Sequence, residues 1–131
     1  MNKKKVILII VEGISDKISL EAIFEELFSN NKIYIEVIRG DVTSDSKINS
    51  RNIKKKIGEL INNSIKKSYF RKNDLQEIIH IIDMDGVYIN NKRIIQKKDL
   101  VKSEYSEEYI FTNDITNIIE RNNKKCEKLN V

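Results

Sequence analysis

The sequence predicts an α/β fold: a mostly parallel central sheet of about four strands, helices on both faces, and a β-hairpin after the third strand. Two observations support this. Val6–Val11 and Ile78–Ile82 are short, almost wholly apolar and rich in β-branched residues, as is typical of parallel strands buried under helices. Between them, two segments carry apolar residues at helical spacing. With 131 residues, the chain can bury a sizeable core, and we expect residues 1–131 to form one domain.

The first predicted strand and helix occupy the start of the chain. Val6–Val11 runs into Glu12-Gly13-Ile14-Ser15, a tight turn in which Ser15 is expected to cap the helix. The charge of Asp16 suits the first turn of that helix. Its apolar stripe consists of Leu20, Ile23, Phe24, Leu27 and Phe28. Residues 29–31 are expected to end the helix.

A second strand and helix follow. Ile33–Ile38 alternates polar and apolar residues, which predicts a strand that is less enclosed than the first. The polar loop from Gly40 to Ser50 is expected to leave the same sheet edge as Glu12. The next helix extends from about Asn52 to Phe70, with one apolar face made of Ile53, Ile57, Leu60, Ile61 and Ile65.

The pattern changes after the third strand. Residues 87–95 predict a β-hairpin, because Asn90-Asn91 tolerates the left-handed positions of a tight turn. Tyr109–Thr112 predicts a further strand, and a last helix is expected from about Asp114 to Lys128. His80, inside the third strand, is expected to be a packed and hydrogen-bonded core residue.

Carboxylates follow both buried strands. Glu12 ends the first, and Asp83 and Asp85 follow the third. Parallel strands bring their carboxyl ends to one edge of a sheet, so these side chains are expected to converge. Oxygen ligands, in a chain with one histidine and one cysteine, favour Mg²⁺ or Mn²⁺ over Zn²⁺. The alternative is that all three are ordinary loop acids.

These residues resemble a known family. Val11-Glu12-Gly13-Ile14-Ser15-Asp16 resembles the first motif of TOPRIM domains, and Ile82-Asp83-Met84-Asp85 resembles their Asp-x-Asp motif, which Gly86 follows here. Gly40 stands where these domains often have a glycine, and the resemblance covers roughly residues 5–112. It implies a TOPRIM/Rossmann-like fold and Mg²⁺-dependent phosphodiester chemistry on nucleic acid, with nuclease activity as the expected reaction.

The resemblance also implies roles. Glu12 would be the catalytic acid/base, and Asp83 and Asp85 the metal ligands. In OLD-family nucleases an acid four residues after the first glutamate also holds metal, and Asp16 occupies that position. A favourable helix-dipole charge is an equally good account of Asp16. The alternative function is a nucleic-acid-binding or partner module that has no turnover of its own.

Two other families share part of the pattern. Asp83-Met84-Asp85-Gly86-Val87 also resembles the first motif of haloacid-dehalogenase phosphatases, in which Asp83 would be the nucleophile. Those enzymes need a Ser/Thr, a Lys and further aspartates downstream, and the chain shows no comparable set after Gly86. Response-regulator receivers need paired acids after the first strand, where this chain has Glu12-Gly13. Both resemblances are weaker than that to TOPRIM.

The charge and composition of the chain limit the kinds of partner that it can have. The net charge of +4 is compatible with DNA or RNA. Basic residues expected near the acidic edge are Lys47, Arg51, Lys54, Lys55, Lys92 and Arg93, which would neutralise phosphates or form a solvated surface. A partner or fused ATPase or helicase, and a homodimer, are also compatible. A single cysteine and the lack of a long apolar run predict a cytoplasmic protein without membrane contact. Tyr88, Tyr105 and Tyr109 would cover apolar surface or stack on bases.

Overall fold

The computed structural model describes residues 5–29 and 33–131, and the chain forms two compact units. The first unit is the described part of Met1–Ile48 together with Asn52–Ile82. The second unit is Asn49–Arg51 together with Asp83–Val131. Each unit has a sheet of its own and is described by itself. That residues 1–131 act as one domain stays a prediction.

The first unit contains the predicted parallel sheet, with three strands. They are β1 (Lys5–Val11), β2 (Ile33–Arg39) and β3 (Leu75–His80), in the order β2-β1-β3. Both neighbours run parallel to β1, and Ile9 pairs with Val37 on one side and with Ile79 on the other. The α/β class and the parallel pairing are therefore confirmed, with the first strand of the chain at the centre.

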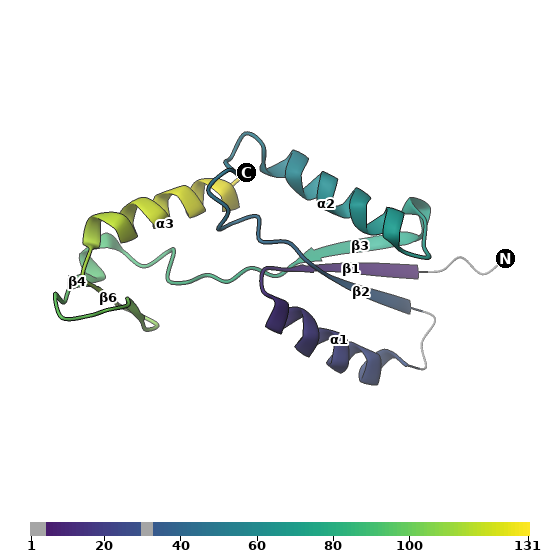
Figure 1. Cartoon of the computed structure of the whole chain (residues 1–131), viewed down its shortest axis with the longest axis horizontal. Coiled ribbons are helices and arrows are strands. Elements are labelled where there is room, and N and C mark those ends of the chain that lie inside the picture. Colours follow the sequence, from purple (N-terminus) through teal and green to yellow (C-terminus); the bar gives the residue numbers. More distant parts are fainter. Residues whose placement is uncertain (1–4, 30–32) are drawn as a thin grey trace. The chain divides into compact units, whose positions relative to one another are not determined.

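Helices cover both faces of this sheet, as Figure 1 shows. Alternate residues of β1 point to opposite faces. Ile9 packs with Leu20 and Phe24 of α1 (Ile14–Phe28), whereas Leu8 packs with Ile61 and Ile65 of α2 (Ile53–Lys67). The continuous apolar run of the first strand is thus explained, because the side chains on both of its faces meet a hydrophobic layer.

The helix ends differ from the sequence predictions in detail. Gly13, with φ −102° and ψ 154°, is the N-cap of α1, so Ser15 lies inside the helix and the prediction that it caps was wrong. The N-cap carbonyl already accepts the first helical bond, from the Lys17 N–H, at 3.2 Å. The second helix ends at Lys67 because Ser68 is extended, at φ −105° and ψ 166°. The predicted end of α1 at residues 30–31 lies outside the described residues.

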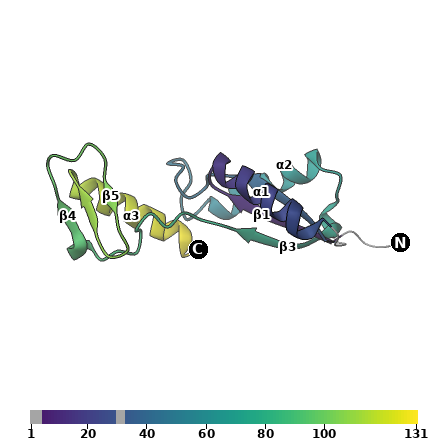
Figure 2. The same cartoon turned by 90° about the horizontal axis from the view of Figure 1, so that it is seen from below.

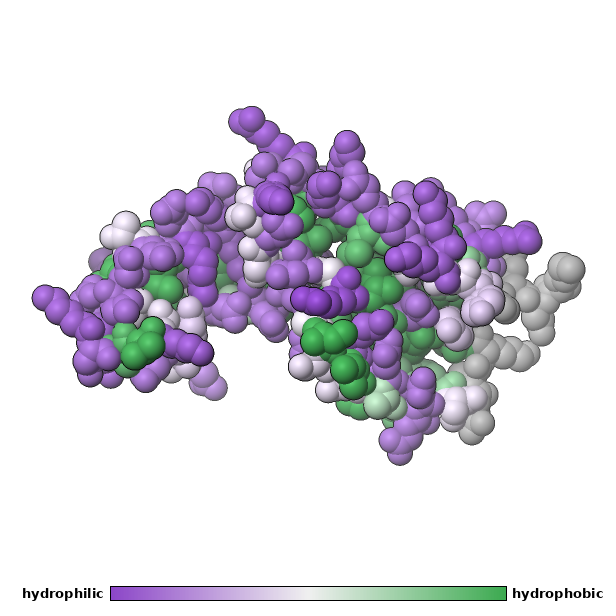
Figure 3. Space-filling view, in the orientation of Figure 1, coloured by the Kyte–Doolittle hydropathy of each residue, from purple (hydrophilic) through white to green (hydrophobic). Residues whose placement is uncertain are grey.

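The helices differ in how much apolar surface they leave open. Each of the three α-helices in the described part of the chain is 15 residues long. No residue of α1 is fully buried, and Ile18 and Leu27 are 62% and 64% exposed. Figure 3 shows hydrophobic side chains at the surface over α1. Within residues 5–29 and 33–131, no helix has the length and hydropathy to cross a membrane.

The second unit is a small sheet covered on one face by a helix. Its strands are β4 (Ile94–Gln96), β5 (Glu104–Tyr105) and β6 (Ile110–Thr112), in the order β4-β6-β5, with β4 parallel and β5 antiparallel to β6. α3 (Ile115–Leu129) lies against the strands in Figure 2. Ile94, Ile110 and Ile118 form the core of this unit. The Asp114 side chain caps α3 by accepting a hydrogen bond from the Asn117 N–H at 3.0 Å.

Two predictions about this region were wrong. Residues 87–95 do not form a hairpin: Ile89 N–H donates to the Gly86 carbonyl at 3.0 Å, and the short 3-10 helix η2 (Asn91–Arg93) follows. The Asn90 side chain accepts from the Lys92 N–H at 2.9 Å, so a local Asx turn replaces the expected ladder. The predicted strand at 109–112 pairs with β4 and β5, not with β3. The expected four-stranded sheet is therefore divided between the two units.

Candidate functional site

Glu12 is held at the carboxyl end of β1. It directly follows the strand, and its side chain is only 8% exposed. The hydroxyl of Thr43 donates to Oε1 of Glu12, and Arg39 Nε donates to its backbone carbonyl at 3.4 Å. A buried carboxylate oriented by a neighbouring hydroxyl suits a functional acid, because burial and hydrogen bonding fix its position.

The loop that brings Thr43 to Glu12 depends on a glycine. Gly40 N–H donates to the Val11 carbonyl at 2.8 Å, and Val42 N–H donates to the Gly40 carbonyl at 3.0 Å. A Cβ at Gly40 would collide with the side chain of Leu60 in α2. The loop therefore passes close to the helix, and a larger residue here would require the Leu60 side chain to move. Gly40 was selected from the sequence but Thr43 was not, although its place in the loop expected at the acidic edge was a usable signal.

Asp16 lies in the first turn of α1, as predicted, and its side chain is exposed. A Cβ at Gly13 would lie 2.8 Å from Oδ2 of Asp16. The glycine thus leaves room for the carboxylate beside the helix N-terminus, where a negative charge is favourable. Glu12, Gly13 and Asp16 form a short acidic segment within the first unit.

The Asp-x-Asp-Gly segment forms a tight turn in the second unit. Met84 O accepts a hydrogen bond from the Val87 N–H at 2.9 Å, and the two central residues have positive φ, 48° at Asp85 and 67° at Gly86. Two consecutive positive φ values are what a type I′ turn requires, and Asp-Gly is a preferred pair for it. A Cβ at Gly86 would also lie only 3.0 Å from Ile89 and 3.1 Å from Ile110. Local turn chemistry therefore explains both Asp85 and Gly86.

Two basic residues of α3 hold this turn. Lys125 is 4% exposed; its Nζ donates to the Asp83 carbonyl and lies 3.3 Å from Oδ2 of Asp85. Arg121 Nη2 donates to the Asp85 carbonyl at 2.6 Å, and its Nη1 donates to the Tyr105 hydroxyl at 2.9 Å. Neither basic residue was selected from the sequence. Their spacing of four on a predicted helix was the available signal, since it places them on one face.

Asn122 is the polar neighbour of this pair and is 3% exposed. Its Oδ1 accepts hydrogen bonds from Arg121 Nε at 3.1 Å and Nη2 at 2.6 Å. Its Nδ2 is buried and has no hydrogen-bond partner in the described part of the chain. The side chain thus helps to fix the Arg121 guanidinium against the turn.

The acids expected to share a cation are divided between the units. Glu12 and Asp16 belong to the first, and Asp83 and Asp85 to the second. Within either unit, the described residues include no group of three His, Cys, Asp or Glu side chains placed to hold a metal ion. The convergence of Glu12 with Asp83 and Asp85 stays a prediction.

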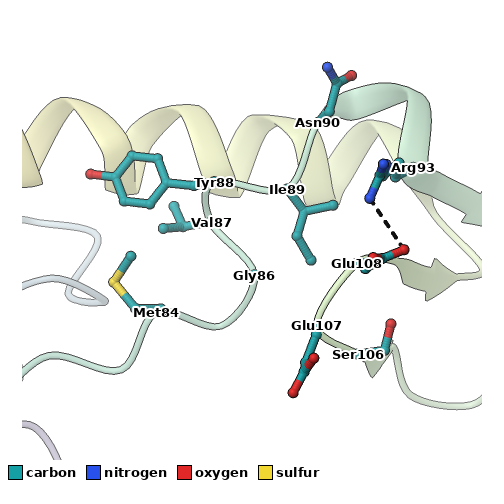
Figure 4. A pocket seen from close by; sticks show the side chains of 10 residues that line it. All are labelled: Met84, Gly86, Val87, Tyr88, Ile89, Asn90, Arg93, Ser106, Glu107 and Glu108. Atoms are coloured by element: carbon teal, nitrogen blue, oxygen red, sulfur yellow. Dashed lines mark ion pairs between the residues drawn. The ribbon is translucent and has the colours of Figure 1, made fainter.

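The six basic residues selected from the sequence are all exposed. Lys47, Lys54 and Lys55 belong to the first unit, and Arg51, Lys92 and Arg93 to the second. Arg93 Nη1 lies 3.4 Å from Oε2 of Glu108 (Figure 4). The pair stands beside a pocket of about 580 Å³ that Met84, Tyr88 and Ile89 also line. Their exposure leaves all six side chains accessible to solvent.

His80 ends β3 and is partly buried. Burial lowers the pKa of its imidazole below the usual value of 6.5. Its buried Nε2 has no hydrogen-bond partner among residues 5–29 and 33–131. The expectation of a packed side chain is thus met in part, but the expected hydrogen bond is not formed at Nε2.

The candidate residues therefore lie in two acidic segments, and contacts within its own unit hold each segment in place. In one, a buried glutamate is held by a threonine. In the other, an aspartate turn is held by an arginine and a lysine. No protein-family model matches this chain, and the comparisons with curated proteins and with solved structures gave no match either.

Proposed function

We propose that this protein carries out Mg²⁺-dependent phosphodiester chemistry on nucleic acid, as a TOPRIM-like nuclease. The observation that carries the proposal is the neighbouring, parallel placement of β1 and β3. Glu12 follows β1 directly, and the chain reaches Asp83 three residues after β3 ends at His80. Ile81 N–H donates to the Ile10 carbonyl at 2.8 Å, which continues the pairing beyond β3. Both acidic segments thus follow strands that end at the same edge of one sheet.

The donor chemistry fits a hard cation. Glu12, Asp83, Asp85 and Asp16 would hold it, and all of them offer carboxylate oxygens, which Mg²⁺ and Mn²⁺ prefer. When bound, such an ion would stabilise the negative charge that develops on the phosphate oxygens. Glu12 would move the proton of the attacking or leaving oxygen, with Thr43 fixing one of its carboxylate oxygens. Exposed Lys and Arg side chains would neutralise the flanking phosphates.

The test is cleavage of labelled DNA and RNA in Mg²⁺, in Mn²⁺ and in EDTA. Glu12→Gln keeps an oxygen for the Thr43 hydroxyl, so we expect it to stay folded and to lose cleavage about a hundredfold or more, the usual worth of general acid/base catalysis. Asp83→Asn should lose it as well. The matched controls are Glu59→Gln and Asp99→Asn, which change exposed acids outside both segments. Unchanged cleavage by folded Glu12→Gln or Asp83→Asn would contradict the proposal.

One observation favours a second function, a nucleic-acid-binding or partner module without turnover. The ammonium group of Lys125 lies beside Asp85 and bonds to the Asp83 carbonyl. It thus supplies positive charge where a metal ion would otherwise do so. This alternative predicts salt-dependent binding with no cleavage in any divalent ion. Divalent-dependent cleavage that Asp83→Asn abolishes would rule it out.

A further inference from the structure

The sheet β4-β6-β5 has one covered and one open face. Along β6, Ile110 is 0% exposed and packs with Ile118 of α3, whereas Tyr109, just before the strand, is 38% exposed. Successive side chains of a strand point to opposite faces, so Tyr109 and Phe111 share the face that α3 does not cover. Ile95 of β4 pairs with Phe111 and is 39% exposed on that face. The open face therefore carries an apolar and aromatic row.

The two aromatic rings lie nearly parallel. The centroids of Tyr109 and Phe111 are 6.2 Å apart, and their planes differ by 18°. A cation accompanies each ring: Lys97 Nζ is 4.2 Å from the Phe111 centroid, and the Arg93 guanidinium carbon is 5.6 Å from that of Tyr109. Ile95 lies on this face through its pairing with Phe111, and the contacts of Arg93 and Lys97 with the two rings place both cations on the same face.

We propose that this open face binds single-stranded nucleic acid, with Tyr109 and Phe111 stacking on bases and Arg93 and Lys97 contacting phosphates. Aromatic side chains beside a basic row are the arrangement that binds single strands, because every base offers a π-face. The bases of a duplex are already stacked on each other, so the platform selects single strands. The inference rests on the proposed function and specifies its substrate.

The two cations beside the rings, Arg93 and Lys97, lie on the β4 side of the face. The Arg93–Glu108 pair is solvent-exposed, at 50% and 67%, and such pairs contribute little, so a phosphate can replace the carboxylate. Glu104 pairs with Phe111 across β5 and β6, so it brings a negative charge to the opposite side of the rings from Lys97. Its charge repels phosphates, so the nucleic-acid backbone is expected on the β4 side.

Arg93 links the platform to a pocket beside the aspartate turn of the same unit, and Glu107 and Glu108 also line that pocket. Arg93 and Glu108 form one wall of the pocket shown in Figure 4, and Met84 and Gly86 lie across it. Met84 stands between Asp83 and Asp85 in the chain, and Tyr88 adds an exposed ring on that side. A strand whose bases stack on β6 would thus reach the edge of this pocket at Arg93.

The test is fluorescence anisotropy with the full chain, a labelled oligothymidylate and a labelled duplex of equal length, in EDTA so that cleavage plays no part. We expect tighter binding of the single strand. Tyr109→Leu and Phe111→Leu should each weaken it about fivefold or more, the worth of one stacked base. Tyr109→Phe should bind normally. The control Tyr69→Leu removes a tyrosine that is 98% exposed in the first unit and should have no effect.

Salt dependence tests the cations separately. Lys97→Gln should lower the slope of log K against log salt concentration by about 0.7, the value for one phosphate contact on a single strand. Lys124→Gln is the matched control, because Lys124 is an exposed lysine of α3 that pairs with Glu120. Equal loss of slope in both variants would overturn the assignment of Lys97.

Three results would overturn the platform. They are equal affinity for duplex and single strand, normal binding by folded Tyr109→Leu, and dimerisation through this face that Tyr109→Leu abolishes. Phe111 is the more buried ring, and Phe111→Leu is therefore the variant more prone to unfolding. If it unfolds, the binding of Tyr109→Leu tests the platform. Failure of the proposed chemistry is a separate outcome, since binding in EDTA would persist while cleavage in Mg²⁺ is absent.

Discussion

The two units differ in how many faces of their sheets are covered by helices. In the first, β1 lies between two strands and two helices, so its even- and odd-numbered side chains both reach a hydrophobic layer. In the second, α3 covers only one face of a sheet whose strands are two or three residues long. The first arrangement favours a rigid frame that positions Glu12. The second leaves a face of aromatic and basic side chains available for binding.

The largest expected effect concerns the frame. Leu8 is fully buried in β1, so Leu8→Ala should lower the free energy of unfolding by about 2–5 kcal/mol. Ile78→Ala, on an exposed side chain of β3, should cost much less. Denaturant unfolding measures both. Similar losses would mean that β1 is not the better-packed strand.

The second unit depends more on polar contacts. Lys125→Met keeps the aliphatic stem but removes the hydrogen bond to the Asp83 carbonyl and the ion pair with Asp85. A loss of about 1–3 kcal/mol is expected, since the hydrogen bonds of a charged and buried ammonium group are lost. Lys124→Met breaks an exposed pair with Glu120 and should cost at most about 0.5 kcal/mol. A neutral Lys125→Met would show that the turn holds without α3.

Replacing a glycine by alanine is expected to destabilise the second unit at Gly86 and to stabilise the first unit at Gly58. Gly86→Ala places a side chain at φ 67° and against Ile89 and Ile110, so we expect it to destabilise by about 1–2 kcal/mol. Gly58→Ala is in α2 with nothing within 4 Å, and should stabilise by about 0.5–1 kcal/mol. Thermal unfolding compares the two. A stable Gly86→Ala would contradict the left-handed turn.

The smallest effect is the pH dependence of the first unit. Burial lowers the pKa of His80, so below pH 6.5 the unfolded state binds a proton more readily than the folded state. The free energy of unfolding therefore does not depend on His80 above pH 6.5, where the imidazole is neutral in both states. It decreases as the pH falls below 6.5, because the unfolded state is protonated first. His80 is the only histidine, so His80→Phe should flatten the profile between pH 5 and about 7. An unchanged profile would show that carboxylates dominate this range.

Periodicity predicted the first unit well because its elements are long. The runs Val6–Val11 and Ile33–Ile38 specify strands by composition, and Ile61 and Ile65 specify the inner face of α2. The second unit was predicted less well. Its strands are too short for a period to be read, and Asn90 formed a side-chain turn where a hairpin was expected.

The candidate site shows the same division. Glu12 follows a strand end, so the sequence indicates it, whereas Gly40 was selected through the family resemblance and its close packing against Leu60 is a finding of the structure. Thr43, Arg121 and Lys125 act through contacts between residues distant in the chain. No local pattern specifies such contacts. The Asp85-Gly86 pair allowed two interpretations. It matches the Asp-x-Asp-Gly pattern expected of metal ligands, and it is also a preferred pair for a type I′ turn, which the structure contains.

The position of β3 has a consequence for the handling of the protein. β3 is an edge of its sheet, and Ile78, Ile79 and, just beyond it, Ile81 are all exposed. An isoleucine-rich edge is a template for pairing with another chain, and β3 lacks the lysine or proline that usually prevents this. Concentrated solutions are therefore expected to aggregate through this edge, and Ile78→Lys should raise solubility.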